Sequence, residues 1–326
     1  MSRRFLAVLT ALAILTAAAG STAALANRRS TQAPTKQITI YLIAGITTDA
    51  FYITMKKGAL AAAAKLGVKL VFQGAPVWSA PKQIPFLDAA IARKPDAILI
   101  APTDTRSLVA PIKRAIAAGI PVATVDTAIS APIAFTSVST DNLAGGRAAA
   151  DALAKLSGMK GKVAGINTIP GITTTDQRQQ GFEQKLKTYP SIQNLGTQFS
   201  NDDQTKASQE TAALLTAHPD LKGIFAMNVV TGNGVSAAIK NAGKAGKVKV
   251  VEFDAGSDQV AALKAGTVDA LIAQDPFGIG SLGVQLAVKY VKGQKAGILK
   301  HYGTGSAIVT RANVNSPAIK KFLYTK

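Results

Sequence analysis

The sequence predicts an α/β fold of two similar lobes, each a doubly wound parallel sheet. Short Val/Ile/Leu-rich runs alternate with longer Ala-rich stretches of helical period, which is typical of βαβ units. This alternation restarts halfway along the chain, and the 326 residues exceed the usual size of one domain. The composition, 48% hydrophobic and 17% charged, is that of a folded chain.

The first lobe is expected to begin with four strands separated by three helices. Its strands are the runs rich in β-branched residues, near 37–44, 68–73, 96–101 and 120–125. The Ala-rich stretches between them predict helices near 50–66, 79–94 and 105–118. Because twisted strands favour right-handed crossovers, successive strands should lie parallel.

The second lobe follows the helix-like segment "DNLAGGRAAADALAKLSG". Its strands are expected near 162–167, 193–199, 222–227 and 247–253. Helices are expected near 175–188, 204–217, 232–242 and 257–264.

The N-terminus has the order of a secretory signal peptide. Arg3 and Arg4 precede an apolar run over residues 5–19, and small residues follow up to Ala26. The run is short and Ala-rich for a membrane span, so we expect cleavage after Ala26; an uncleaved anchor helix is the alternative. With no cysteine in the chain, a lipid anchor, disulfides and thiolate chemistry are excluded, which predicts an unanchored periplasmic protein.

Charge and missing motifs argue against other function classes. The net charge of +19 comes from scattered lysines without interleaved aromatic residues. This pattern favours a solvated basic surface over a surface that binds nucleic acid or an anionic membrane. His218 and His301 stand apart in expected loops, and no nucleophile elbow, phosphate loop or dinucleotide fingerprint follows a strand. We therefore expect no enzyme, cofactor or metal, although paired carboxylates leave glycoside hydrolysis as a rival.

A polar residue ends each of several apolar runs. These residues are Asp49 in "IYLIAGITTDAFY", Asp126 in "IPVATVDT", Asn228 in "KGIFAMN", Asp254 in "VVEFDAG" and Gln274 in "VDALIAQ". Ligands of parallel sheets bind at the carboxyl ends of the strands, so these side chains should line one crevice shared by the two lobes.

Helix capping is the alternative explanation for several of these carboxylates. Asp104 in "APTDTRSLVAPIK" and Asp141 in "STDNLAGG" are better explained as N-caps. Asp49 and Asp254 could also cap helices, but a cap does not explain the adjacent "FY" pair at 51–52. Carboxylates and amides suit sugar hydroxyls, and aromatic faces cover the C–H side of a sugar ring. The set predicts binding of a carbohydrate or polyol without catalysis.

Residues 39–294 resemble a periplasmic binding protein of the ribose-binding type, which delivers ligand to an ABC importer. The motifs are "DAFYITMKKGA", "ILIAPTD", "IPVATVDT", "STDNLAGG", "QRQQGF", "LLTAHPDLKGIFAMN", "VVEFDAG" and "LIAQDPFGIG", in the family's order. The resemblance implies a three-segment hinge: the chain crosses between the two lobes near Thr140, Gln274 and Gly303, and the hinge closes over the ligand. The implied lobes are 27–140 plus 275–303 and 141–274 plus 304–326.

The resemblance also implies the ligand contacts. In the first lobe they fall on Asp49, Phe51, Tyr52 and Asp126; in the second they fall on Arg178, Asn228, Asp254 and Gln274. Thr127 stands where the ribose binders resembled carry Arg, and a stacking Phe is replaced near Asp202, so ribose itself is doubtful. Trp78 could replace the lost aromatic surface or pack on its own lobe.

The resulting hypothesis is a small neutral sugar or sugar alcohol that is handed to a membrane permease; sensing of the ligand for a chemoreceptor is an alternative. The alternative ligand is a furanose-like signalling molecule or an amino compound, since Asp49, Asp126, Asp176 and Asp254 could hold a cation. A regulator of the lactose-repressor type would need a DNA-binding helix-turn-helix where the signal peptide lies.

Overall fold

The computed structural model describes residues 36–324 of the chain. The predicted signal peptide, residues 1–26, lies outside these residues. Among the described helices, none combines the length and the hydropathy that crossing a membrane requires.

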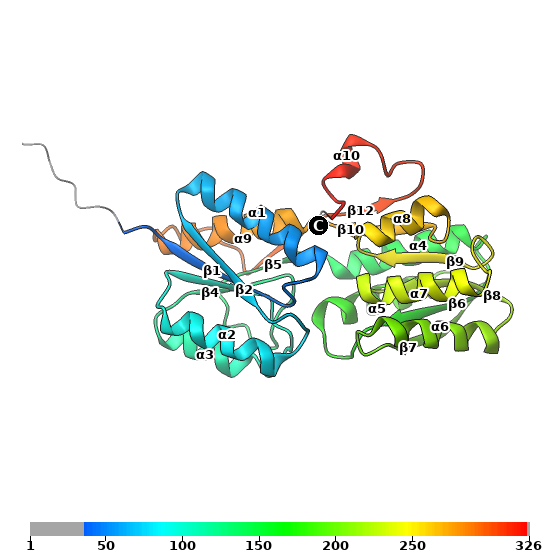
Figure 1. Cartoon of the computed structure of the whole chain (residues 1–326), viewed down its shortest axis with the longest axis horizontal. Coiled ribbons are helices and arrows are strands. Elements are labelled where there is room, and N and C mark those ends of the chain that lie inside the picture. The colour runs from blue at the N-terminus through cyan, green and yellow to red at the C-terminus, as the bar shows by residue number, and fades with distance from the viewer. Residues whose placement is uncertain (1–35, 325–326) are drawn as a thin grey trace, which may run out of the picture. The chain divides into compact units, whose positions relative to one another are not determined.

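The first lobe contains a six-stranded, entirely parallel sheet in the order β11-β5-β4-β3-β1-β2. The strands are β1 (Thr39–Ala44), β2 (Lys69–Gly74), β3 (Ala97–Ile100), β4 (Val122–Val125), β5 (Ser137–Thr140) and β11 (His301–Thr304). Its helices are α1 (Ala50–Leu66), α2 (Ala80–Ala92), α3 (Val109–Ala117) and α9 (Pro276–Val291). Helices α1 and α9 cover one face, and α2 and α3 cover the other (Figure 1).

Strand β1 shows why the strands of this lobe are apolar on both faces. Ile40 and Leu42 join the core beneath α1 and α9, whereas Ile43 joins the core beneath α2 and α3. Successive side chains of a strand point to opposite faces, so helices on both faces require a continuous apolar run.

The second lobe has the same architecture in the order β12-β10-β9-β8-β6-β7. The strands are β6 (Gly161–Asn167), β7 (Ile192–Phe199), β8 (Leu221–Ala226), β9 (Lys249–Phe253), β10 (Ala270–Gln274) and β12 (Ser306–Val309). Only β12 runs antiparallel, beside β10. The helices are α4 (Asn142–Leu156), α5 (Thr173–Leu186), α6 (Gln204–Ala217), α7 (Val229–Asn241), α8 (Ser257–Ala265) and α10 (Pro317–Lys320). The predicted α/β fold of two parallel-sheet lobes is confirmed.

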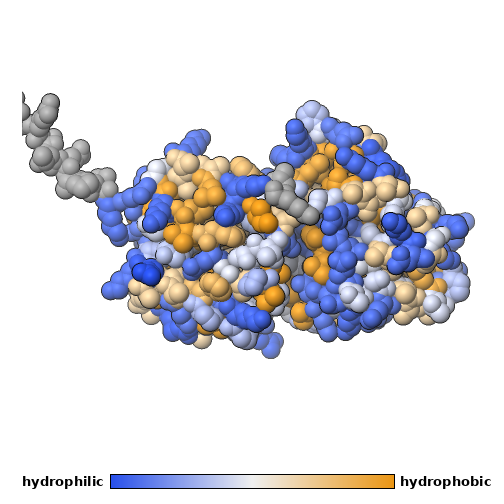
Figure 2. Space-filling model, viewed as in Figure 1, coloured by the Kyte–Doolittle hydropathy of each residue, from blue (hydrophilic) through white to orange (hydrophobic). Residues whose placement is uncertain are grey.

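The chain passes between the two sheets three times: after β5, after β10, and between β11 and β12. After β10 it returns to the first lobe, because α9 packs on α1. On the face shown in Figure 2, hydrophilic residues spread over both lobes, and the surface is notched where the lobes meet.

Two glycines bring α4 and α5 into close contact in the second lobe. A Cβ on Gly146 would lie 2.1 Å from the carbonyl oxygen of Arg178, and a Cβ on Gly181 would lie 2.2 Å from that of Leu143. Any larger residue at either position would push the helices apart. This packing fixes the backbone from which the Arg178 side chain extends.

Candidate ligand-binding site

A cavity lies between the two lobes, at the carboxyl ends of the strands, as the polar strand ends predict. Nine of the eleven sequence-predicted residues line it: Asp49, Phe51, Tyr52, Trp78, Asp126, Arg178, Asn228, Asp254 and Gln274. The remaining lining residues are Ile46, Thr168, Ile172, Thr174, Thr175, Asp202 and Val229. Both lobes therefore contribute polar groups to one space.

Asp126 and Asp254 directly follow β4 and β9 in an unusual backbone conformation. Their φ angles are +64° and +85°, in the left-handed region that Asp tolerates better than most residues. Each amide still donates to the neighbouring strand, from Asp126 to the Val138 carbonyl (2.8 Å) and from Asp254 to that of Ile272 (2.9 Å). In both lobes the chain therefore leaves the sheet immediately after this hydrogen bond to the neighbouring strand, at a turn that places the carboxylate in the cavity.

The Asp126 carboxylate is buried and has a single side-chain donor among residues 36–324. The hydroxyl of Tyr52, in the first turn of α1, donates to its Oδ2 at 2.6 Å. Burial raises the pKa of Asp126 to about 6, although Tyr52 and the charge of Arg178 oppose the shift. An acceptor that carries one hydrogen bond at Oδ2 keeps further lone pairs for a ligand hydroxyl.

The Asp254 carboxylate has two donors on one oxygen. Oδ1 accepts hydrogen bonds from Gln274 Nε2 at 2.6 Å and from the Tyr324 hydroxyl at 2.7 Å. Oδ2 lies 4.0 Å from Nη1 of Arg178. Asp254 is therefore oriented by three side chains, of which Tyr324 is absent from the sequence-predicted set.

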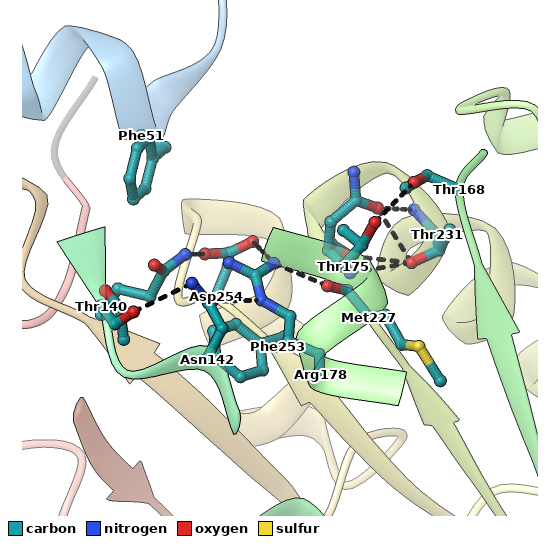
Figure 3. A network of polar contacts seen from close by, with 12 residues as sticks. Phe51, Thr140, Asn142, Thr168, Thr175, Arg178, Met227, Thr231, Phe253 and Asp254 are labelled. Carbon is teal, nitrogen blue, oxygen red and sulfur yellow. Dashed lines mark hydrogen bonds and ion pairs between the residues drawn. The ribbon is translucent and has the colours of Figure 1, made fainter. Parts of the chain in front are cut away.

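Arg178 is held rigidly in the second lobe. Its Nε donates to Asn142 Oδ1 (2.8 Å) and its Nη1 donates to the carbonyl of Met227 (2.7 Å), as Figure 3 shows. The guanidinium lies 3.7 Å above the ring centroid of Phe253, a cation–π contact. The buried positive charge thus has fixed partners and is preorganised beside Asp254.

Asp49 has both functions considered for it: it caps α1 and it lines the cavity. Its Oδ1 accepts from the backbone amide of Phe51 at 2.7 Å. Burial, together with the negative charges of Asp254, Asp202 and Asp126, raises its pKa to about 7, and the bond from Phe51 opposes the shift. The cap sets the start of α1 and so places the 51–52 pair in the first turn, facing the cavity.

Asn228 connects the start of α7 to Asp202. Its Oδ1 accepts from the amide of Thr231 at 2.8 Å, which makes it the N-cap of α7. Its Nδ2 donates to Asp202 Oδ1 at 2.8 Å. Burial raises the pKa of Asp202 to about 6. The Asn228 amide therefore links the N-terminus of α7 to this acid.

Three aromatic side chains line the cavity from the first lobe. Phe51 lies edge-on to Tyr52 with ring centroids 5.2 Å apart, and Trp78 packs on Tyr52 at 6.5 Å. Gly45 makes room for them, because a Cβ there would lie 2.5 Å from the Trp78 ring. Trp78 thus both packs on its own lobe and lines the cavity.

The structure does not bring Thr127 and Asp176 into the cavity. Thr127 is buried, and its hydroxyl donates to the carbonyl of Pro102 at 2.7 Å. Asp176 accepts from the amide of Gly171 at 2.9 Å and lines a separate surface hollow. Residues two apart on a helix point in different directions, so Asp176 and Arg178 cannot face the same site on α5.

The cavity carries more negative than positive groups. Four carboxylates line it, those of Asp49, Asp126, Asp202 and Asp254, against the single guanidinium of Arg178. Within residues 36–324, no three His, Cys, Asp or Glu side chains are grouped so as to hold a metal ion. The arrangement offers hydrogen-bond acceptors, a few donors and ring faces, the groups that recognise a hydroxylated ring.

Comparison with known families agrees with this geometry. Residues 40–295 match the family model described as periplasmic binding protein domain. The chain belongs to this family. The ribose import binding protein RbsB of Salmonella typhimurium is 35% identical over 260 residues, which cover 79% of this chain and 86% of that protein.

Solved structures of family members superpose closely on this chain. An ABC transporter solute-binding protein from Agrobacterium vitis, bound with α-D-tagatopyranose, is 46% identical with a TM-score of 0.86, and the match covers 89% of this chain and 100% of that one. A second A. vitis solute-binding protein, with bound D-fucose, is 34% identical with a TM-score of 0.82, over 88% and 100%. These relatives are binding proteins, in agreement with the prediction that the chain is not an enzyme.

Proposed function

We propose that the protein captures a small neutral sugar or sugar alcohol between its two lobes and delivers it to the permease of an ABC importer. The observation that carries the proposal is the pairing of Asp126 and Asp254 across one cavity that aromatic rings also line. Carboxylates accept bidentate hydrogen bonds from neighbouring hydroxyls, and ring faces cover C–H groups. Since the 46% identical relative was solved with α-D-tagatopyranose, D-tagatose is our first candidate.

Membership of the family supports delivery to a permease and a periplasmic location. Ligand that contacts both lobes stabilises a closed form, which is the form a permease would recognise. Export would place the protein in the periplasm, with the signal peptide removed near Ala26. A chemoreceptor would read the same closed form.

Titration calorimetry tests this function. D-Tagatose, D-fucose, D-arabinose, D-allose, D-ribose and galactitol would be titrated separately into the purified mature chain. We expect one of them to bind in the micromolar range or tighter, and to raise the unfolding free energy by about 2.7 kcal/mol at 100 times its dissociation constant. If none binds at millimolar concentration, the sugar proposal is wrong.

A second candidate ligand is an amino sugar, favoured by the four carboxylates that face a single guanidinium. An ammonium group would offset part of this excess negative charge, which a neutral sugar leaves in place. Galactosamine and galactose form a matched pair that differs at one substituent. Tighter binding of galactosamine, reversed in D49N and D202N variants, would favour this candidate over the neutral sugar.

A further inference from the structure

Tyr324 lies behind the cavity and contacts both lobes. Its hydroxyl donates to Asp254 Oδ1 at 2.7 Å and accepts from the amide of Gln274 at 3.3 Å. Its own amide donates to the carbonyl of Ala255 at 3.0 Å, which fastens it to the second lobe. Its ring lies edge-on to Phe51 of the first lobe, with centroids 5.8 Å apart and planes at 73°. The side chain is 5% exposed.

The first lobe contains a counterpart of this arrangement. Tyr52 donates to Asp126 as Tyr324 donates to Asp254, and both acids occupy the same place after their strands. Phe51 makes edge-on contacts with both tyrosines. Each acid at a strand end thus has its own tyrosine, and one phenylalanine joins the two pairs.

We propose that Tyr324 is a positioning residue: it orients Asp254 toward the ligand and, through Phe51, links this orientation to the approach of the lobes. The inference rests on the proposed function of sugar binding. It assigns a role in ligand recognition to the C-terminal segment after α10, which lies beyond residue 295, where the family match ends.

The hydrogen bonds explain how Tyr324 would act on Asp254. The terminal torsion of an aspartate has a broad, roughly two-fold preference, so the plane of its carboxylate is set by its partners. The Tyr324 hydroxyl and Gln274 Nε2 both hold Oδ1, which leaves Oδ2 directed toward Arg178. Without the hydroxyl, Gln274 Nε2 is the one donor left on Oδ1, so the carboxylate plane is held less firmly.

The Phe51 contact explains the link to closure. Tyr324 is fastened to the second lobe by Asp254, Gln274 and Ala255, whereas its ring edge meets the first lobe at Phe51. Separation of the lobes would break this aromatic contact, and their approach would restore it. Phe51 also lines the cavity, so ligand and Tyr324 would hold the same ring from two sides.

The test is a double-mutant cycle with D-tagatose, or with whichever panel sugar the wild type binds. Y324F removes the hydroxyl and keeps the ring; we expect affinity to fall by roughly tenfold, as for a lost hydrogen bond to a charged group. In a D254N background, Y324F should lower the affinity for sugar by less than twofold. Y189F is the matched control, since Tyr189 also donates to a carboxylate, that of Asp151, but does not line the cavity.

Each outcome has a defined meaning. If Y324F binds within twofold of the wild type, or loses as much affinity in D254N as in the wild type, Tyr324 does not act through Asp254 and the inference is wrong. If D254N binds sugar too weakly to measure, Q274A takes its place in the cycle. Y324F should then lower the affinity for sugar more in the Q274A background than in the wild type. If the affinity losses of Y324F and Q274A are additive, the inference is wrong. A wild type that binds no panel sugar overturns the proposed function and this inference together.

Discussion

Asp126 and Asp254 occupy equivalent places in the two lobes. Each directly follows the fourth strand of its lobe along the chain, has a positive φ, and donates its amide to a neighbouring strand, at 2.8 Å and 2.9 Å. Each carboxylate accepts a hydrogen bond from a tyrosine hydroxyl. The cavity is therefore built from two copies of one structural device, and a ligand between them would bridge the lobes.

The first prediction concerns this pair. D126N and D254N keep the shape of each side chain but replace a charged acceptor with a neutral amide. If each carboxylate accepts ligand hydroxyls, each substitution should weaken sugar binding by on the order of 1.5 to 3 kcal/mol. Calorimetry on the folded variants measures the change.

Asp176 supplies the matched control for these variants, because it lies on α5 but outside the cavity. D176N should bind sugar as the wild type does. Unchanged affinity in both D126N and D254N would reduce the two acids to structural residues at the ends of their strands.

The sequence was sufficient to predict the sheets wherever apolar runs are long. The run before Asp254 becomes β9, and "KGIFAMN" contains most of β8, because helices cover both faces of the sheet. By contrast, β5 ("SVST") and β11 ("HYGT") carry small and polar residues and were not predicted. They pair with each other at the sheet edge, so their strand structure depends on tertiary contacts.

One helix starts later than the sequence predicts. The helix expected near 105–118 begins at Val109, because Asp104 caps a preceding turn through the amides of Arg106 and Ser107.

The site was predictable where a polar residue ends a strand, and less so elsewhere. Tyr324 gave no signal, since "FLYTK" has neither a motif nor a period that points to a site. The role proposed for it depends on a hydrogen bond to Asp254, 70 residues away in sequence.

The second prediction concerns Glu252, a fully buried acid on β9. Its Oε1 accepts from Ser236 Oγ at 2.6 Å, and its Oε2 has no hydrogen-bond partner among the described residues. Burial raises its pKa from 4.5 to about 7. Between these values the folded chain retains a proton that the unfolded chain has released, so the free energy of unfolding falls as pH rises through this window.

The variant E252Q tests this dependence, because glutamine resembles the protonated acid at every pH. Relative to the wild type, E252Q should gain on the order of 2 to 4 kcal/mol of unfolding free energy between pH 4.5 and pH 8. Urea denaturation at several pH values across the window gives the comparison. A constant difference between the two proteins at all pH values would mean that Glu252 does not titrate in it.

The third prediction concerns export. Arg3 and Arg4, the apolar run and the small residues before Asn27 should direct secretion and cleavage after Ala26. Intact-mass measurement of periplasmic material should give a chain that begins at Asn27. A mass that includes Met1, or retention in the cytoplasm, would contradict the assignment.

The fourth prediction concerns Arg178 and closure of the lobes. A ligand shifts the equilibrium between open and closed forms only by its differential affinity for the two, so contacts from both lobes are needed. R178A removes a second-lobe donor beside Asp254; it should weaken sugar binding and reduce the ligand-induced decrease in radius of gyration measured by small-angle X-ray scattering. D104A, in a turn outside the cavity, should cost about 0.5 to 2 kcal/mol of stability and leave compaction unchanged. If saturating sugar leaves the scattering of an open wild-type protein unchanged, delivery through lobe closure is wrong even though sugar binds.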